Sequence, residues 1–453
     1  MDIGNGNSRL ESLRPVSHGD RVFNLVSYTL MLWASLIVIQ GFVLGQALLP
    51  PQGNLSLVQG TVVVLLSALI MALFMSLNGA AGLQHGIPFC IQVRAAFGIR
   101  GARFPEFIRL VPAIIWYGFG TWIAALAMDA IIQTLTGFTV PGIKIIYFIA
   151  FLIIQTWFAC RGIRTMKWLT VTASVALVLI IGQMLFSTLQ REQFEITETW
   201  RISGDWGWSF WTGVNATVGI LVAVMVSASD LTRYLENKRS SMWLGHFFGL
   251  VPPLTLMMFL GFVSAVTTGQ WDPIQALMQL SPSPLIMILM LVFILVAQFS
   301  TNLTVNILPP ALIFEELFGI NWQKGVILTG ILASFTFPWV LLESGTNFVA
   351  FINYYTAFFG PLLGCMLAQR WLENDQLQID DLYDESPASK YWYVAGLNPA
   401  AIVSTLVVAV VIMLWWLQIS WLVGLPLGIL SYIILVRVFN YFSKQLNPEH
   451  GDI

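Results

Sequence analysis

The chain has 453 residues, of which 57% are hydrophobic and 10% are charged, and its formal net charge is -2. Apolar stretches recur from end to end, and such a composition is too apolar for one soluble core. It therefore indicates a polytopic membrane protein, and the net charge argues against a nucleic-acid partner.

Twelve apolar stretches are long enough to cross a bilayer, whose core of about 30 Å takes about 20 helical residues. Runs such as 285–296 show none of the alternation that a membrane β-barrel requires. We predict an all-α membrane protein with twelve transmembrane helices. These are expected at 23–48, 57–80, 106–134, 143–160, 165–190, 207–233, 241–269, 283–314, 325–343, 346–371, 397–417 and 419–441.

Basic residues predict the orientation, because Lys and Arg in short loops mark the cytoplasmic side. With the N-terminus inside, only Lys144, Arg191 and Arg201 of the 21 basic residues lie outside. Both termini are therefore expected in the cytoplasm, and the protein in the plasma membrane, which in a bacterium is the inner membrane. The extramembrane pieces are then an N-terminal tail 1–22, an outer loop 191–206, a cytoplasmic connection 372–396 and a C-terminal tail 442–453.

Signs of an enzyme or a resident metal are missing from the sequence. Cys90, Cys160 and Cys365 lack the spacing of a metal or redox site, and the four histidines are scattered. No zinc-protease or nucleophile-elbow motif occurs. Polar groups gather at one depth rather than in a continuous stripe, which disfavours a channel. We predict a monomeric membrane protein in the lipid bilayer that is not an enzyme and has no cofactor.

The polar stretch 297–306, late in the eighth apolar segment, is the strongest functional signal. Hydroxyls and amides have no water to bond at bilayer depth, so they pair with a neighbouring helix or coordinate a transported species.

Two segments carry signs of a broken helix. The first has Gln40-Gly41 near its middle with Gly45-Gln46 beyond, and the sixth has Val218-Gly219-Ile220. Broken helices at matching positions hold substrate and ion in inverted-repeat transporters, and a separation of five helices suits a five-plus-five repeat. Each glycine taken alone is better explained by close helix packing than by a hinge.

Several motifs together resemble the nucleobase:cation symporter family of purine, pyrimidine, allantoin and hydantoin permeases, most closely its hydantoin and allantoin branch. The resemblance runs from residue 20 to residue 440. It rests on Gly86-Ile87-Pro88-Phe89, Phe97-Gly98-Ile99-Arg100-Gly101, Ile115–Trp122, Leu135–Phe138, Ser300–Asn306, Gly360-Pro361-Leu362 and Asp381-Leu382-Tyr383.

The resemblance implies two inverted five-helix repeats, at 23–190 and 207–371, followed by two further helices at 397–441. It also implies uptake of substrate with Na+ or H+, and a bend in the tenth helix near Gly360-Pro361.

A cation site between helices one and eight is also implied by the resemblance. It would use the Ala297 carbonyl, the Ser300 and Thr301 hydroxyls, and carbonyls near Ser35 and Val38. Oxygen ligands suit a hard cation, and the absence of a neighbouring carboxylate favours Na+ over H+. The alternative is that the hydroxyls of Ser300 and Thr301 only bond the preceding turn of their own helix.

For the substrate, the resemblance assigns stacking to Trp116 and hydrogen bonding of the ring edge to Asn306. The hydantoin-type permeases carry a glutamine and a second tryptophan where this chain has Gly120 and Leu221. We therefore expect a larger and more apolar pocket on that side. In helix one, the family register points to Ile39, whereas Gln40 is the adjacent amide, and both remain open.

The expected function is cation-coupled uptake of a nucleobase-like or related nitrogen heterocycle by alternating access. The alternative is cation-coupled transport of a non-aromatic ureide or another small polar metabolite, because one stacking wall is missing.

Overall fold

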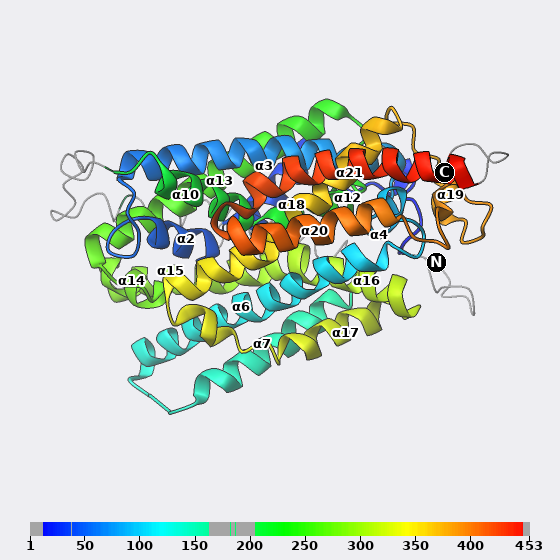
Figure 1. Ribbon diagram of the computed structural model, residues 1–453. Coiled ribbons are helices and arrows are strands. Elements are labelled where there is room, and N and C mark those ends of the chain that lie inside the picture. Colours follow the sequence, from blue (N-terminus) through cyan, green and yellow to red (C-terminus); the bar gives the residue numbers. More distant parts are fainter. Residues whose placement is uncertain (1–11, 38, 163–181, 183–185, 187–203, 447–453) are drawn as a thin grey trace.

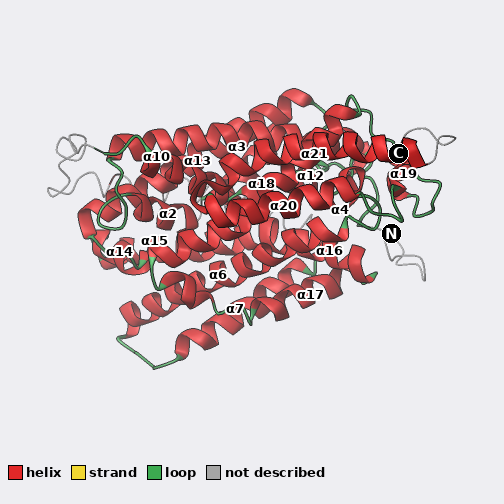
Figure 2. Ribbon diagram, viewed as in Figure 1, coloured by secondary structure: helices red, strands yellow, loops and turns green. Residues whose placement is uncertain are grey.

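The structure, a computed structural model, describes residues 12–37, 39–162, 182, 186 and 204–446. Within these ranges the chain forms helices and connecting segments but no strand, which confirms the predicted all-helical architecture (Figure 2). The predicted span 165–190, most of the loop 191–206 and the outer parts of both tails lie outside the described residues.

The helices follow the apolar stretches closely along the chain. They are η2 (His18–Asp20), α1 (Leu25–Leu36), α2 (Ile39–Leu48), α3 (Leu57–His85), α4 (Phe89–Gln92), α5 (Arg94–Phe97), α6 (Arg103–Thr136), α7 (Ile143–Ala159), α10 (Trp208–Gly219), α11 (Val222–Val226), α12 (Ser229–Thr232), α13 (Arg239–Thr268), α14 (Pro273–Leu280), α15 (Pro284–Thr301), η3 (Asn302–Ile307), α16 (Leu308–Phe318), α17 (Trp322–Ala333), η4 (Pro338–Leu342), α18 (Gly345–Leu372), α19 (Ile379–Tyr383), η5 (Lys390–Trp392), α20 (Pro399–Trp415), η6 (Leu417–Ile419) and α21 (Ser420–Leu446).

Six described helices are long and apolar enough to cross a membrane, and a seventh span arises if the bent pair α1 and α2 is one crossing. The six are α3, α6, α13, α15 continued through α16, α18, and α21 with η6. Helices α7 and α20 are shorter and also apolar. The count of twelve spans stays a prediction.

Polar caps fix where the helices begin. The Asn24 side chain accepts a hydrogen bond from the Ser27 backbone N–H, and the Asn24 backbone N–H donates to the Ser27 hydroxyl in return, which closes the start of α1. Ser56 and Gln59 do the same at the start of α3. Such caps satisfy backbone N–H groups that have no partner within the helix.

The helices pack side by side into an elongated bundle (Figure 1). α13 lies along both α3 and α2, α15 lies along α6, and α18 lies along α21. The outer face of α20 carries exposed Val403, Val407, Val410 and Leu414. Apolar side chains on the outside of a bundle are what a lipid environment favours over water.

Small residues allow the closest helix contacts. A side chain added at Gly45 of α2 would meet the Met258 carbonyl of α13 at 2.3 Å, and one added at Gly428 of α21 would meet Pro361 of α18 at 2.4 Å. α18 continues as one helix through Gly360-Pro361. The expected bend of the tenth helix stays a prediction, and the dipeptide forms the surface on which α21 packs.

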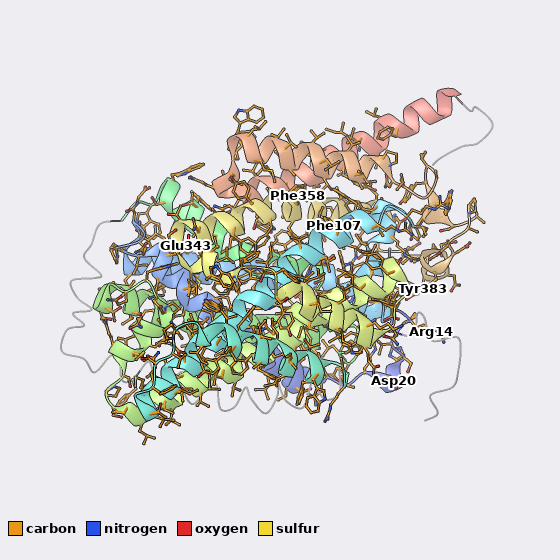
Figure 3. All side chains as sticks on the ribbon, turned by 90° about the horizontal axis from the view of Figure 1, so that it is seen from below. Arg14, Asp20, Phe107, Glu343, Phe358 and Tyr383 are labelled. Carbon is orange, nitrogen blue, oxygen red and sulfur yellow. The ribbon has the colours of Figure 1, made fainter. Side chains whose placement is uncertain are left out.

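The described chain begins and ends at the same end of the bundle, beside α19 (Figure 1). Arg14, Asp20 and Tyr383 lie at this end, and Glu343 lies at the opposite end (Figure 3). The Tyr383 hydroxyl donates to the Leu13 carbonyl over 2.6 Å. This contact ties the connection after α18 to the N-terminal segment.

Candidate substrate and cation site

A cavity lies where the broken helices meet α6 and α15. It has about 40 Å³ of space for the centres of water molecules, so it is small in this conformation. Its lining residues are Ser35, Leu36, Gln40, Gly41, Arg109, Trp116, Ile220, Leu221, Ala223, Val224, Leu254, Thr301, Val305 and Asn306.

Both predicted helix breaks are present beside this cavity. α1 and α2 are bent by 56°. The break follows Leu36, so it lies a turn before the Gln40-Gly41 pair that we expected to form it. α10 ends at Gly219 and α11 begins at Val222, which leaves Ile220 and Leu221 at the cavity wall. Interrupted helices expose backbone groups that are otherwise used within the helix.

A π-helical turn, η3, interrupts the polar stretch of the eighth apolar segment. Asn302 at its start donates to the Tyr117 carbonyl at 3.3 Å, to the Thr121 hydroxyl at 3.2 Å and to Gln155 Oε1 at 2.9 Å. Asn306 in turn donates to Asn302 Oδ1 at 2.9 Å. π-Turns are rare and concentrate at functional sites, and this one directs Asn306 to the cavity wall.

Trp116 is positioned by other aromatic rings. It is 6% exposed and makes edge-to-face contacts with Phe119, Phe348 and Phe351 at centroid distances of 5.5, 5.8 and 5.3 Å. Edge-to-face packing uses the ring edges of one partner and fixes the indole orientation. Trp116 lines the cavity together with Leu221 and Asn306, and its stacking role stays a prediction.

Of the two candidates in helix one, Gln40 lines the cavity and Ile39 does not, although both are buried. The two amides of Gln40 and Gln298 exchange hydrogen bonds, each Nε2 lying 3.2 Å from the other residue's Oε1.

The expectation for Gly120 is wrong. Gly120 does not widen the cavity, because the Gln298 and Asn302 amides fill the space beside it. A Cβ atom at position 120 would lie 2.7 Å from Gln298 Oε1 and 3.0 Å from Asn302 Oδ1. The missing side chain therefore admits polar groups from α15 and η3.

The predicted cation ligands of α15 meet the end of α1. The Ser300 hydroxyl donates to the Ala34 carbonyl at 2.8 Å and to the Ala297 carbonyl at 3.0 Å. The Thr301 hydroxyl lies 3.4 Å from the Ala34 carbonyl and 3.2 Å from the Ser35 carbonyl. Five neutral oxygens thus converge between the two helices, at the point where α1 ends. Hard cations prefer such ligands.

The alternative reading of the two hydroxyls holds in part. Ser300 does bond one carbonyl in the preceding turn of its own helix, but the hydrogen bonds of Thr301 go to α1. The Ser35 hydroxyl contacts the Thr304 hydroxyl at 2.8 Å and so joins the same helix pair. Val38, the remaining predicted ligand, lies outside the described residues.

Arg109 was missed as a member of the site. It is buried at the cavity wall, where Nε donates to the Ser227 hydroxyl at 2.9 Å and Nη2 to the Val305 carbonyl at 3.1 Å. Its guanidinium thereby connects α6 to the end of α11 and to η3. A signal existed, because an arginine inside an apolar segment usually has a functional or pairing role.

Asp230 and Asp129, two of the buried acids, do not belong to the cavity wall. Asp230 accepts a hydrogen bond from the Phe89 backbone at 2.8 Å. Asp129 accepts one from Gln133 and lies 3.7 Å from Lys144. Neither lines the cavity.

Comparison with known proteins agrees with this geometry. The family model for permeases of cytosine and purines, uracil, thiamine and allantoin matches residues 15–435. An allantoin permease of Bacillus subtilis is 28% identical over 86% of this chain and 86% of its own length. A hydantoin permease of Microbacterium maritypicum is 28% identical over 83% of this chain and 79% of its own length.

Solved structures extend the similarity to the fold. Mhp1, a nucleobase-cation-symport-1 family transporter in a closed conformation with bromovinylhydantoin bound, matches with a TM-score of 0.83 at 25% identity. The match covers 95% of this chain and 96% of that one. A Na+-coupled sialic acid symporter shares the fold with a TM-score of 0.64 at 14% identity.

Broken helices around a buried cavity, apolar spans and permease relatives define a multi-pass membrane transporter, not an enzyme. More narrowly, the chain belongs to the family of permeases for cytosine and purines, uracil, thiamine and allantoin.

Proposed function

We propose that this protein is a cation-coupled symporter that takes up a nucleobase-like or related nitrogen heterocycle by alternating access. One observation carries the proposal. The Ser300 and Thr301 hydroxyls meet the Ala34 and Ser35 carbonyls at the end of α1, directly beside a cavity lined by an indole and two amides. Ion and substrate would then bind to the same helix break, so each could stabilise the conformation that binds the other.

Na+ is the proposed coupling ion. The converging ligands are hydroxyl and carbonyl oxygens, and Thr301 also lines the substrate cavity. Among the described residues no group of three or more His, Cys, Asp or Glu side chains could hold a metal ion. A proton-coupled site needs a group that changes protonation, and the oxygens of this cluster do not.

The cavity chemistry supports a flat polar ring as the substrate. The face of Trp116 offers stacking, and the amides of Gln40 and Asn306 each offer donors and an acceptor. Buried polar atoms of the substrate need such partners, because each one left unpaired costs about 1–3 kcal/mol.

A non-aromatic ureide is the second candidate. Trp116 is the single aromatic residue among the described lining residues, and the lining from the sixth segment includes the apolar residues Ile220, Leu221 and Val224. A ring that needs no second stacking partner fits this wall. The similarity to the allantoin permease of Bacillus subtilis points the same way.

The proposed topology has twelve spans in two inverted five-helix repeats, followed by two further helices. Helices α1–α3 and α10–α13 would move against α6, α7 and α15–α17. Both termini would face the cytoplasm of a bacterial cell, with the protein a monomer in the inner membrane. That the described chain begins and ends at one end of the bundle supports this arrangement (Figure 1).

The test is thermal stabilisation of the purified protein by nucleobases, hydantoins, allantoin and vitamin heterocycles, each with Na+ or with K+ at equal ionic strength. A ligand that binds only the native state raises the melting temperature by mass action. We expect a Na+-enhanced shift with at least one ring. No shift with any ring in either salt would contradict the proposal.

A further inference from the structure

Four amide side chains at the cavity fall into two groups. Gln40 and Asn306, the pocket amides, belong to the cavity wall. Gln298 and Asn302, the supporting amides, are fully buried and lie next to Gly120. Each pocket amide is hydrogen-bonded to one supporting amide.

The supporting amide Asn302 has a fixed polarity. The Tyr117 carbonyl can only accept, so the Nδ2 group of Asn302 must point toward it. The Thr121 hydroxyl gives its one proton to the same carbonyl at 2.8 Å, so its oxygen can only accept from Asn302. Asn302 Oδ1 is therefore directed at Asn306.

The orientation of the Asn302 amide determines the orientation of the Asn306 amide. Because Asn302 presents an oxygen, Asn306 must turn its Nδ2 group toward it, as the 2.9 Å contact shows. Asn306 Oδ1 then accepts no hydrogen bond from the described part of the chain and is left for a ligand donor. The Tyr117 backbone carbonyl, two hydrogen bonds away from Asn306, thus determines which atom the cavity wall presents.

Gln40 is oriented by a different contact. Its reciprocal pair with Gln298 uses one N–H and one oxygen lone pair of each amide. One N–H and one lone pair of Gln40 remain for a ligand. The pair depends on Gly120, because a Cβ atom there would displace Gln298 Oε1.

We propose that Gln298 and Asn302 are positioning residues that set substrate selectivity through Gln40 and Asn306. Within the proposed substrate class, the wall pairs specific atoms: an unsubstituted ring N–H would donate to Asn306 Oδ1, and a ring carbonyl would accept from Gln40. This inference rests on the proposed function and narrows it.

The experiment compares binding of uracil, hypoxanthine and hydantoin with that of their ring-N-methyl derivatives, by thermal stabilisation of the purified protein in Na+. For the parent protein we expect at least one ring to bind about tenfold more tightly than a derivative methylated at a donating nitrogen, as the loss of one buried hydrogen bond predicts. Stabilisation only by rings that lack an N–H would overturn the inference while leaving the proposed function standing. No stabilisation by any heterocycle would remove both.

Variants then test the supporting amides. Gln298→Met and Asn302→Leu should lower the selectivity for the N–H ring toward equal binding, with the apparent Na+ affinity retained. The isosteric Thr121→Val should act in the same direction and covers the case in which Asn302→Leu does not fold. Unchanged selectivity in Gln298→Met and in Thr121→Val would overturn the proposal.

A matched control is available elsewhere in the bundle. Asn353 of α18 accepts from Asn215 of α10 at 3.1 Å, a buried amide pair that does not line the cavity. Asn353→Leu should reduce thermal stability as the loss of a buried hydrogen bond does, yet leave the selectivity unchanged. An equal loss of selectivity in this control would show that the effect is general to the bundle and would overturn the positioning role.

Discussion

Asn306 combines a cavity position with a fixed orientation, which makes it the most informative single residue to change. Asn306→Ala removes the wall oxygen and leaves Asn302 Oδ1 without its donor. We expect loss of substrate uptake, with a fall in affinity of tenfold or more, and retained expression and Na+ binding. Uptake by cells that express the variant at a verified level is the measurement, and normal uptake would remove Asn306 from the site.

For the ion, the most informative residues to change are Ser300 and Thr301 of α15. Ser300→Ala combined with Thr301→Ala removes two of the five converging oxygens but little volume. The concentration of Na+ needed for half-maximal stimulation of binding should rise at least tenfold. Thr329→Ala, which removes a buried hydroxyl that bonds only within α17, is the matched control. An unaltered response to Na+ in the double variant would exclude the cation site.

For single residues, the sequence could indicate those that stand out within their own segment. Polar groups at membrane depth are costly without a partner, which singled out the stretch 297–306. The roles of Trp116, Asn306 and the two hydroxyls of α15 were implied by the family resemblance. The contact between Gln298 and Gly120 could not be predicted from the sequence. The two residues are 178 positions apart in the chain and lie on different helices, which come together only in the packed bundle.

Among the elements, the broken helices and the glycine contacts determine the shape of the site. The sequence indicated both broken segments, and it predicted the position of the sixth-segment break at Gly219. It misplaced the first break by about one turn, because glycines at 41 and 45 serve close packing of α2 on α13 instead. The π-turn η3 was unpredictable, since residue type and periodicity do not distinguish it from an α-helix.

The contact of α18 with α21 provides a test of packing without a change in the site. Gly428→Leu would force a side chain against Pro361, where a Cβ atom already lies 2.4 Å from its Cα. Overpacking of this kind costs about 1–3 kcal/mol, so we expect a lower melting temperature with unchanged substrate affinity. Val410→Leu, on the exposed face of α20, should change neither quantity. Reduced affinity in Gly428→Leu would show that α21 influences the cavity.

Glu236 connects the starts of α1 and α13, and its carboxylate makes the stability of the protein depend on pH. Hydrogen bonds from Ser241 and Lys238 hold the pKa of Glu236 below its ordinary value of 4.5, and the Leu25 backbone also donates to it. A lowered folded-state pKa gives stability that is present above the ordinary value and is lost as pH falls through the lower one. Glu236→Ala should therefore lower the melting temperature slightly at pH 7, by less than about 2 °C because solvent reaches the partly exposed group and screens its charge.

The pH series itself is the control for Glu236. The difference between parent and variant should shrink as the pH is lowered below 4.5, because the parent carboxylate then becomes protonated. A difference that stays constant between pH 7 and pH 3.5 would show that the carboxylate charge contributes nothing.

For the whole molecule, the central question is whether ion and substrate share one conformational equilibrium. Both candidate sites use the end of α1: the Ala34 and Ser35 carbonyls for the ion, and Gln40 just beyond the break for the substrate. If each ligand favours the same state, each must tighten the other by the same factor. For the whole molecule, composition and the placement of charged residues predicted a membrane protein. The coupling of ion and substrate depends on how α1 and α15 are aligned, and no local sequence pattern predicts that alignment.

The most direct measurement is uptake into proteoliposomes of the heterocycle that stabilises the protein most in Na+, under an inward Na+ gradient, with K+ and an inward proton gradient as separate comparisons. We predict accumulation above the external concentration with the Na+ gradient alone, and its loss in the Ser300→Ala, Thr301→Ala double variant. Equilibration without accumulation, or equal accumulation driven by protons in the absence of Na+, would contradict Na+-coupled symport.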